Sequence, residues 1–148
     1  MNTDLLVERL IQKRDVLSQL RELADHQTRM VGDGDVSKLM GLLATKQKML
    51  NGLQNVETSL DPFRDEDPDH RVWRSAADRQ AARDIAGECD RLLKEVKKIE
   101  QNDTRELIAR RDAASSALLG MQGASRARSA YLEQSPDHTG NLDMSSEI

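Results

Sequence analysis

The chain has 148 residues, of which 37% are hydrophobic, 32% are charged and only 2% are aromatic. A compact globular domain of this length usually contains more apolar and aromatic residues, so the composition favours a helical bundle with narrow apolar stripes. The mild formal net charge of −4 argues against a dedicated nucleic-acid-binding protein, which would usually be basic.

The sequence also argues against several other classes of protein. The single cysteine, Cys89, excludes an internal disulfide and a cysteine-rich metal site. No apolar run approaches the roughly 20 residues that a membrane-spanning helix needs, so we expect no membrane insertion. Charged residues interrupt the apolar residues at the N-terminus, which is unlike a signal peptide. We therefore expect a cytoplasmic protein.

The first helix is predicted over residues 3–31. Its apolar residues recur at alternating spacings of three and four, the seam of a helix packed in coiled-coil fashion. Asn2 or Thr3 is expected to cap the first turn, and Asp4 suits the positive end of the helix dipole. The seam positions are Leu6, Leu10, Lys13, Leu17, Leu20, Ala24, Gln27 and Val31.

A second helix of similar length is predicted over residues 36–60. Gly32 and Gly34 allow the positive φ of a tight reversal, and Asp35 is expected to be the N-cap. Two helices of matching length joined by a short turn form an antiparallel hairpin. The apolar stripe is wider than one partner needs, so we expect a third helix to pack against the hairpin. The seam positions are Val36, Leu39, Leu43, Lys46, Leu50, Leu53, Glu57 and Leu60.

Residues 61–72 are predicted to form a linker. Two prolines and several acidic side chains break the helical pattern there, and Phe63 is expected to fold back onto the end of the bundle. The acidic residues do not have the spacing of a calcium loop, which favours a solvated loop over a cation site.

The third helix is predicted over residues 73–132. The heptad has a stutter at Asp103, four residues before Leu107, and Asp103 with Glu106 has the form of a capping box. The helix is therefore expected to be locally unwound, kinked or broken near Asn102. A continuous helix would be roughly 90 Å long, so part of it would project beyond the hairpin, fold back or pair with another chain. Its first seam positions are Ile85, Cys89, Leu92, Val96 and Ile99.

The sequence thus predicts an all-α fold with a single helical bundle domain over residues 1–134. The domain would be an elongated antiparallel hairpin plus a long third helix, forming a three-helix coiled-coil bundle. Residues 135–148 are polar and are predicted to be a flexible tail.

No catalytic, metal or cofactor site is predicted. His26, His70 and His138 lack the spacing of metal ligands, and the place of Cys89 on a seam favours a packed core thiol over a nucleophile. Basic residues of the third helix alternate with acidic ones and have no aromatic residues beside them, which favours a solvated face over a nucleic-acid groove. We expect no enzymatic activity. An enzyme would need a bound cofactor or metal in the purified protein.

Apolar residues in the C-terminal half of the third helix form the candidate partner-binding site. They lie at or beyond the reach of the hairpin, so an exposed strip would suit a partner helix. The alternative is that these residues close an oligomer or the core of the monomer. The candidate residues are Leu107, Ile108, Ala114, Leu118, Leu119, Met121 and Tyr131.

The second helix also carries a motif. A Gly-Asp pair is followed by leucine, lysine and methionine at helical spacings, as Gly34-Asp35, Leu39, Leu42, Lys46, Met49 and Leu53. The motif resembles the hairpin of the FlgN-type flagellar export chaperones over about residues 4–60, and residues 85–131 resemble this family loosely. Asn102 matches an Asn that members often carry, whereas Tyr131 and Gly140 match a C-terminal Tyr and Gly only distantly. The acidic linker and the tail depart from the family pattern.

The resemblance implies a small cytoplasmic all-α chaperone without catalytic activity. Such a protein binds the hook–filament junction proteins, prevents their premature assembly and delivers them to the flagellar type III export apparatus. The alternative is a coiled-coil structural or scaffold protein that acts through homo-oligomerisation, and a homodimer remains open. Neither interpretation involves nucleic acid or a cofactor.

Overall fold

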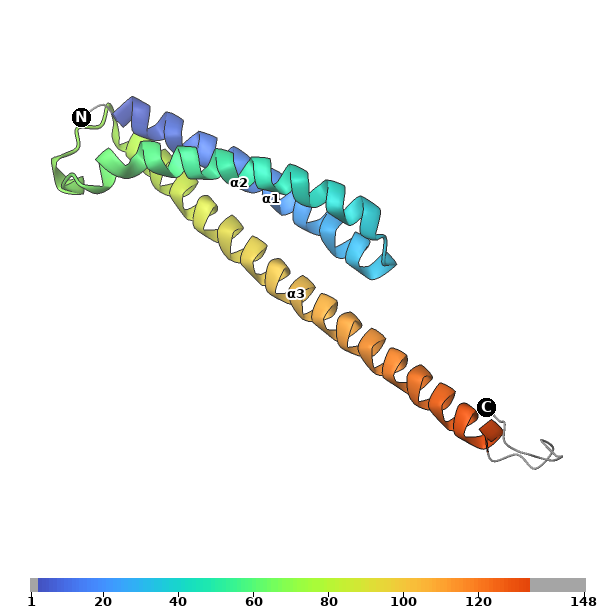
Figure 1. Cartoon of the computed structure of the whole chain (residues 1–148). Helices are drawn as coiled ribbons and strands as arrows, with labels where there is room; N and C mark the ends of the chain where they lie inside the picture. Colours follow the sequence, from blue (N-terminus) through green and yellow to red (C-terminus); the bar gives the residue numbers. More distant parts are fainter. Residues whose placement is uncertain (1–2, 134–148) are drawn as a thin grey trace, which may run out of the picture. The chain divides into compact units, whose positions relative to one another are not determined.

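The computed structural model describes residues 3–133, which fold as three α-helices and one short 3-10 helix without a β-strand in that range. Helix α1 spans Thr3–Asp33, α2 spans Val36–Arg64, the 3-10 helix η1 spans Pro68–His70 and α3 spans Ala76–Glu133 (Figure 1). The predicted all-α fold with three helices is confirmed. The predicted tail, residues 135–148, lies outside the described residues.

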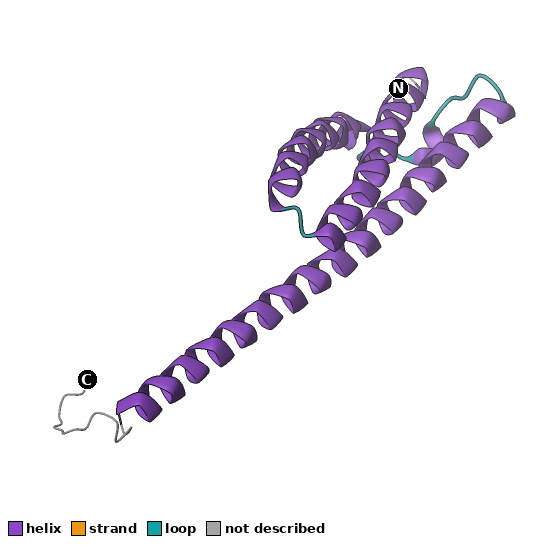
Figure 2. Cartoon of the chain, turned by 90° about the vertical axis from the view of Figure 1, so that its right-hand side faces the viewer, coloured by secondary structure: helices purple, strands orange, loops and turns teal. Residues whose placement is uncertain are grey.

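The chain divides into two compact units between Glu106 and Leu107. We call the described parts unit 1 (residues 3–106) and unit 2 (residues 107–133). Unit 1 contains α1, α2, η1 and the first part of α3, and unit 2 contains the rest of α3. Figure 2 shows the connections within unit 1, a tight turn after α1 and a longer loop that holds η1.

The turn between α1 and α2 follows from its residue types. Gly34 has a backbone φ of 70°, a conformation that costs energy in residues with a Cβ because of steric clashes. Its backbone N–H donates to the carbonyl of Val31 at 3.3 Å and so closes the end of α1. The Asp35 carboxylate accepts from the backbone N–H of Lys38 at 3.0 Å, which confirms Asp35 as the N-cap of α2.

Two apolar clusters hold unit 1 together. The larger one joins α1 to α3 and has Leu17 and Cys89 almost fully buried at its centre. The smaller one joins Leu6 of α1 to Leu60 and Phe63 of α2, with Trp73 packed beside them. Phe63 therefore does fold back onto the bundle, as predicted. The larger cluster consists of Leu17, Leu20, Cys89, Leu92 and Val96.

Helix α2 extends past the predicted end at Leu60 and includes Pro62 in its last turn. Proline lacks an N–H and disfavours a helix interior, but two contacts offset this cost. Phe63 is only 3% exposed, and the Arg64 guanidinium donates to the carbonyl of Glu57 at 3.1 Å. Burial of Phe63 and the bond from Arg64 thus favour one more helical turn.

Helix α3 begins at Ala76 and not at the predicted Trp73. Ser75 is the residue that starts it, because its hydroxyl accepts from the backbone N–H of Asp78 at 3.1 Å. The segment before Ser75 is held to α1 instead, since the Thr3 hydroxyl donates to the carbonyl of Val72 at 3.0 Å.

Helix α3 is continuous through Asn102, so of the predicted alternatives a break does not occur. Asp103 is 3% exposed and accepts from the Gln27 amide at 2.7 Å and from the Thr28 hydroxyl at 2.8 Å. Its carboxylate is therefore bound to α1 and does not cap a new helix. The stutter in the heptad places a polar residue against α1 without ending the helix.

Candidate functional site

Unit 2 carries the predicted partner-binding residues, and every one of its described residues is exposed. The exposed fraction rises from 43% at Leu107 to 68% at Met121. Large apolar side chains at such exposure, gathered on one helix, are typical of an interaction surface. Exposure alone does not assign the role, so partner binding stays a prediction for Leu107, Ile108, Ala114, Leu118, Leu119, Met121 and Tyr131.

The geometry of α3 brings some of these residues together and separates others. An α-helix turns about 100° per residue, which places four of the predicted residues within about 60° of one another. We call this face the apolar strip. Ile108 and Leu119 form a second row, about 100° farther round the helix, and Tyr131 lies about 120° away on the other side. The apolar strip contains Leu107, Ala114, Leu118 and Met121.

Sequence reasoning missed Leu132, which lies on the same face as the apolar strip. It is 54% exposed and falls eleven residues, or about three turns, after Met121. The three-and-four spacing that defined the earlier seams passes through Ser125 and Arg128 before it reaches Leu132. Because both intermediate positions are polar, the pattern was hard to follow to its end.

The apolar strip has basic residues on both flanks. Arg110 and Arg128 lie about 60° to one side of Leu107, and Arg111 lies about 40° to the other. The Arg111 guanidinium donates to Asp112 at 3.2 Å, which orients it along the helix surface. Guanidinium groups therefore flank the strip, and acidic side chains of a partner would complement them.

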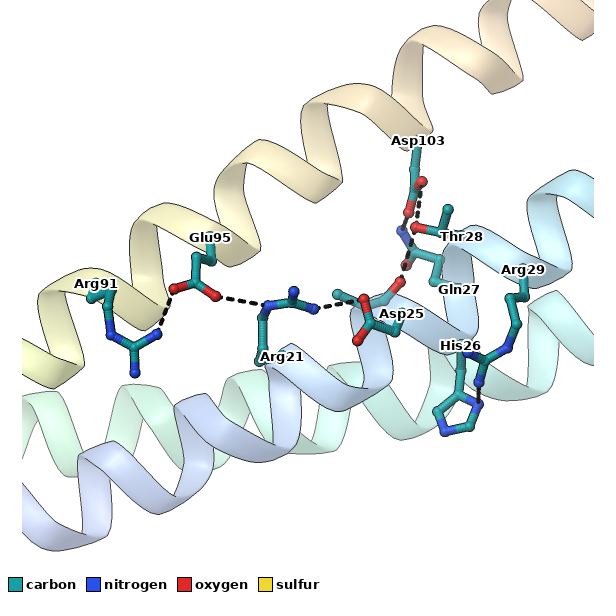
Figure 3. Close-up of polar contacts among 10 residues, drawn as sticks. Arg21, Asp25, His26, Gln27, Thr28, Arg29, Arg91, Glu95 and Asp103 are labelled. Atoms are coloured by element: carbon teal, nitrogen blue, oxygen red, sulfur yellow. Dashed lines mark hydrogen bonds and ion pairs between the residues drawn. The ribbon is translucent and has the colours of Figure 1, made fainter.

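A chain of polar contacts ties α1 to α3 within unit 1 (Figure 3). The Arg21 guanidinium contacts Asp25 of its own helix at 2.6 Å and Glu95 of α3 at 3.0 Å, and Arg91 contacts Glu95 at 2.6 Å. The hydrogen bond from Arg21, followed by that from Arg91, lowers the pKa of the Glu95 carboxyl. These contacts act with those of Asp103 to orient α3 on α1.

A second set of polar contacts joins α2 to its neighbours. The Lys13 ammonium lies 2.8 Å from a Glu57 carboxylate oxygen, and Arg64 donates to the other oxygen at 2.5 Å. Lys46 forms an ion pair with Glu100 of α3 and donates to the side-chain oxygen of Gln27 at 3.2 Å. The polar positions in the predicted seams thus pair with one another across helices.

An apolar groove lies among the three helices in unit 1. Its volume is about 450 Å³, and six leucines from the three helices are among the residues that line it. Lys46, Lys97 and Glu100 are the charged residues that line it. Sequence reasoning missed the groove because the repeat identifies apolar residues but not the neighbour that covers each one. The leucines are Leu17, Leu20, Leu23, Leu50, Leu53 and Leu93.

The cysteine of the chain, Cys89, lies in the larger apolar cluster of unit 1. Cys89 is 1% exposed, and burial raises the pKa of its thiol, so the nucleophilic thiolate is disfavoured. Residues 3–133 contain no group of three or more side chains suited to a metal ion. None of the described helices is long and apolar enough to cross a membrane.

Comparison with known proteins gives no relative for this chain: no family model, no curated protein and no solved structure matches it.

Proposed function

We propose that this chain is a non-enzymatic chaperone that binds an amphipathic helix of a partner protein along the apolar strip of unit 2. The observation that carries the proposal is the strip itself, four apolar residues on one exposed helix face with arginines on both flanks. Such a face suits a partner helix that has an apolar stripe and acidic residues beside it.

The class of partner comes from the motif in α2. Its resemblance to the FlgN-type chaperones supports a flagellar role, in which the partner helices are the terminal helices of the hook–filament junction proteins. The resemblance implies that covering those helices prevents their premature assembly. Release at the type III export apparatus would then follow in the cytoplasm.

The test is co-purification of the full chain with the junction proteins, followed by a Leu118→Asp variant. Burial of a leucine contributes roughly 2 kcal/mol, so placing a charge there should weaken binding about tenfold to a hundredfold. Ser116→Asp is the matched control, because Ser116 is exposed on the opposite face of the same helix. Binding that survives Leu118→Asp, or that is lost equally in Ser116→Asp, would contradict the proposed site.

The alternative function is a scaffold protein that forms homo-oligomers. The observation in its favour is the three-and-four spacing of the strip, which a second copy of the chain would match as well as a partner would. Sedimentation of the purified chain separates the two functions. A stable dimer that Leu118→Asp converts to a monomer would support the scaffold.

A further inference from the structure

The first half of α2 leaves much of its predicted seam uncovered. Val36 is 69% exposed, Leu43 is 39% exposed and Leu50 is 38% exposed, whereas the seam of α1 is mostly buried. Within this half of α2, only Leu42 is buried. Unit 1 thus holds an apolar surface that its own described helices cover only in part.

The uncovered residues have the spacing of a helix-packing seam. Val36, Leu43 and Leu50 follow one another at intervals of seven residues, so they form one row along α2. Met40 is 63% exposed and lies about 40° from Val36, which widens the row. A second helix with the same heptad repeat can pack against this row, because its side chains fill the holes between the side chains of α2.

The row continues into the apolar groove of unit 1. Leu50 belongs to both, and the groove adds Leu23 from α1 and Leu93 from α3 as its walls. A volume of about 450 Å³ is large enough for several apolar side chains. One helix laid along the row would therefore insert its side chains into the groove at Leu50.

The charged residues of the groove specify the chemistry of that helix. Lys46 is paired with Glu100, so these two residues largely neutralise each other. Lys97 also lines the groove and has no ion pair or hydrogen bond within residues 3–133. Lys97 is exposed, so it offers a solvated ammonium group with which a carboxylate of a partner would form an ion pair at the rim of the groove.

We propose that unit 1 is a second docking site, which receives an amphipathic helix of a partner protein. The helix would place apolar residues at heptad spacing against Val36, Leu43 and Leu50, and a Glu or Asp side chain toward Lys97. This site is separate in residues from the apolar strip of unit 2, and it does not depend on the function proposed for that strip.

The experiment uses the full chain and two labelled 21-residue peptides that share leucines at heptad spacing. One peptide has Glu at the flanking positions and the other has Lys. Fluorescence anisotropy should show that the Glu peptide binds about tenfold more tightly than the Lys peptide. Lys97→Glu should reverse this preference, whereas Lys48→Glu should not, because both lysines are exposed but only Lys97 lines the groove.

Two further variants locate the peptide. Leu50→Glu should weaken binding about tenfold, whereas Leu118→Asp in unit 2 should leave it unchanged. Leu43→Glu repeats the test if Leu50→Glu does not fold, since Leu43 is equally exposed. The reverse result, loss with Leu118→Asp and none with the α2 variants, would place the peptide on the strip and overturn the proposal.

Two further outcomes test the role of Lys97 and the identity of the bound helix. Equal binding of the two peptides, or a preference that Lys97→Glu does not change, would overturn the role of Lys97. A free chain that dimerises, and that Leu43→Glu converts to a monomer, would identify the occupant as a second copy and overturn the proposal of a partner protein.

Discussion

Polar side chains at helix-packing positions determine how the faces of unit 1 meet. Burying a polar group costs free energy unless a partner satisfies it, so paired positions favour one arrangement over shifted ones. Gln27 and Asp103 satisfy each other at 2.7 Å, and Lys13 and Glu57 lie 2.8 Å apart. A shift of one helix by a turn would separate both pairs. These residues therefore select the register that the leucines alone would leave open.

Replacing Asp103 tests this role directly. Asp103→Ala would leave the buried Gln27 amide without its acceptor, and we expect a loss of about 2 kcal/mol in the free energy of unfolding. Asp103→Asn keeps one acceptor oxygen and should cost less. Urea denaturation of both variants measures the difference. If Asp103→Ala unfolds at the same urea concentration as the original chain, the buried contact does not stabilise the fold.

Glu57 predicts how stability changes with pH. Burial raises the pKa of its carboxyl, but the ion pairs with Lys13 and Arg64 outweigh burial, so the pKa lies below its ordinary value of 4.5. A carboxyl with a lowered folded-state pKa stabilises the fold above the unfolded-state value and loses that contribution as the pH falls through the folded-state value. We expect the free energy of unfolding to decrease as the pH falls below 4.5.

The Glu57→Gln variant isolates this contribution. Glu95 also has a lowered pKa, but it is present in both proteins, so its effect cancels in the comparison. Glu57→Gln should be less stable than the original chain at neutral pH by about 1 kcal/mol, and the two should converge in acid. Urea titrations at several pH values measure this difference, and a constant difference down to the most acidic pH would contradict the assignment.

The turn between α1 and α2 depends on the backbone conformation of a single residue, Gly34. Gly34→Ala should destabilise the chain by about 1 kcal/mol, because φ is 70° there. Gly32→Ala is the matched control: Gly32 lies inside α1 and a Cβ there meets nothing within 4 Å. That variant should gain roughly 0.5 kcal/mol from helix propensity. Thermal unfolding followed by circular dichroism compares them, and equal changes would show that the turn conformation is unimportant.

The same elements show what a sequence can and cannot predict. The seam of α1 was predicted well, since Leu17, Leu20 and Ala24 have partners on both sides and are all buried. The seam of α2 is covered unevenly: Leu60 is buried, whereas Leu43 is 39% exposed although the repeat is equally regular there. The sequence left Asp103 open between a cap and a stutter in a continuous helix, because its spacing to Glu106 is the same in either role. Only the position of Gln27 and Thr28 distinguishes them.

The candidate partner-binding site was predicted in part, and the groove in unit 1 was not predicted. The sequence identified which residues of α3 are apolar, and helix geometry then assigned Leu107, Leu118 and Met121 to one face. It could not identify the groove in unit 1, whose walls come from three separate helices. Sequence spacing describes one helix at a time, whereas a groove depends on how several helices pack.

Within residues 3–133, burial is confined to unit 1. All buried residues of the described range lie between Thr3 and Asp103, and unit 2 has none. The helical segment of unit 2 has no buried residue, so only its own hydrogen bonds and helix propensity stabilise it. A helix without tertiary packing is only marginally stable in water. The two units should therefore differ strongly in local stability even though α3 runs through both.

Hydrogen exchange should make this difference visible. We expect backbone amides near Leu17, Cys89 and Val96 to exchange slowly, because opening there requires the loss of the larger cluster. Amides of residues 107–133 should exchange within the shortest labelling times. A partner helix bound along the strip would bury Leu118 and Met121, so protection should rise in unit 2 when the partner is added. Strong protection of unit 2 in the free chain at low protein concentration would show that its helix is stable without any partner, and protection that grows with protein concentration would identify a second copy as the cover.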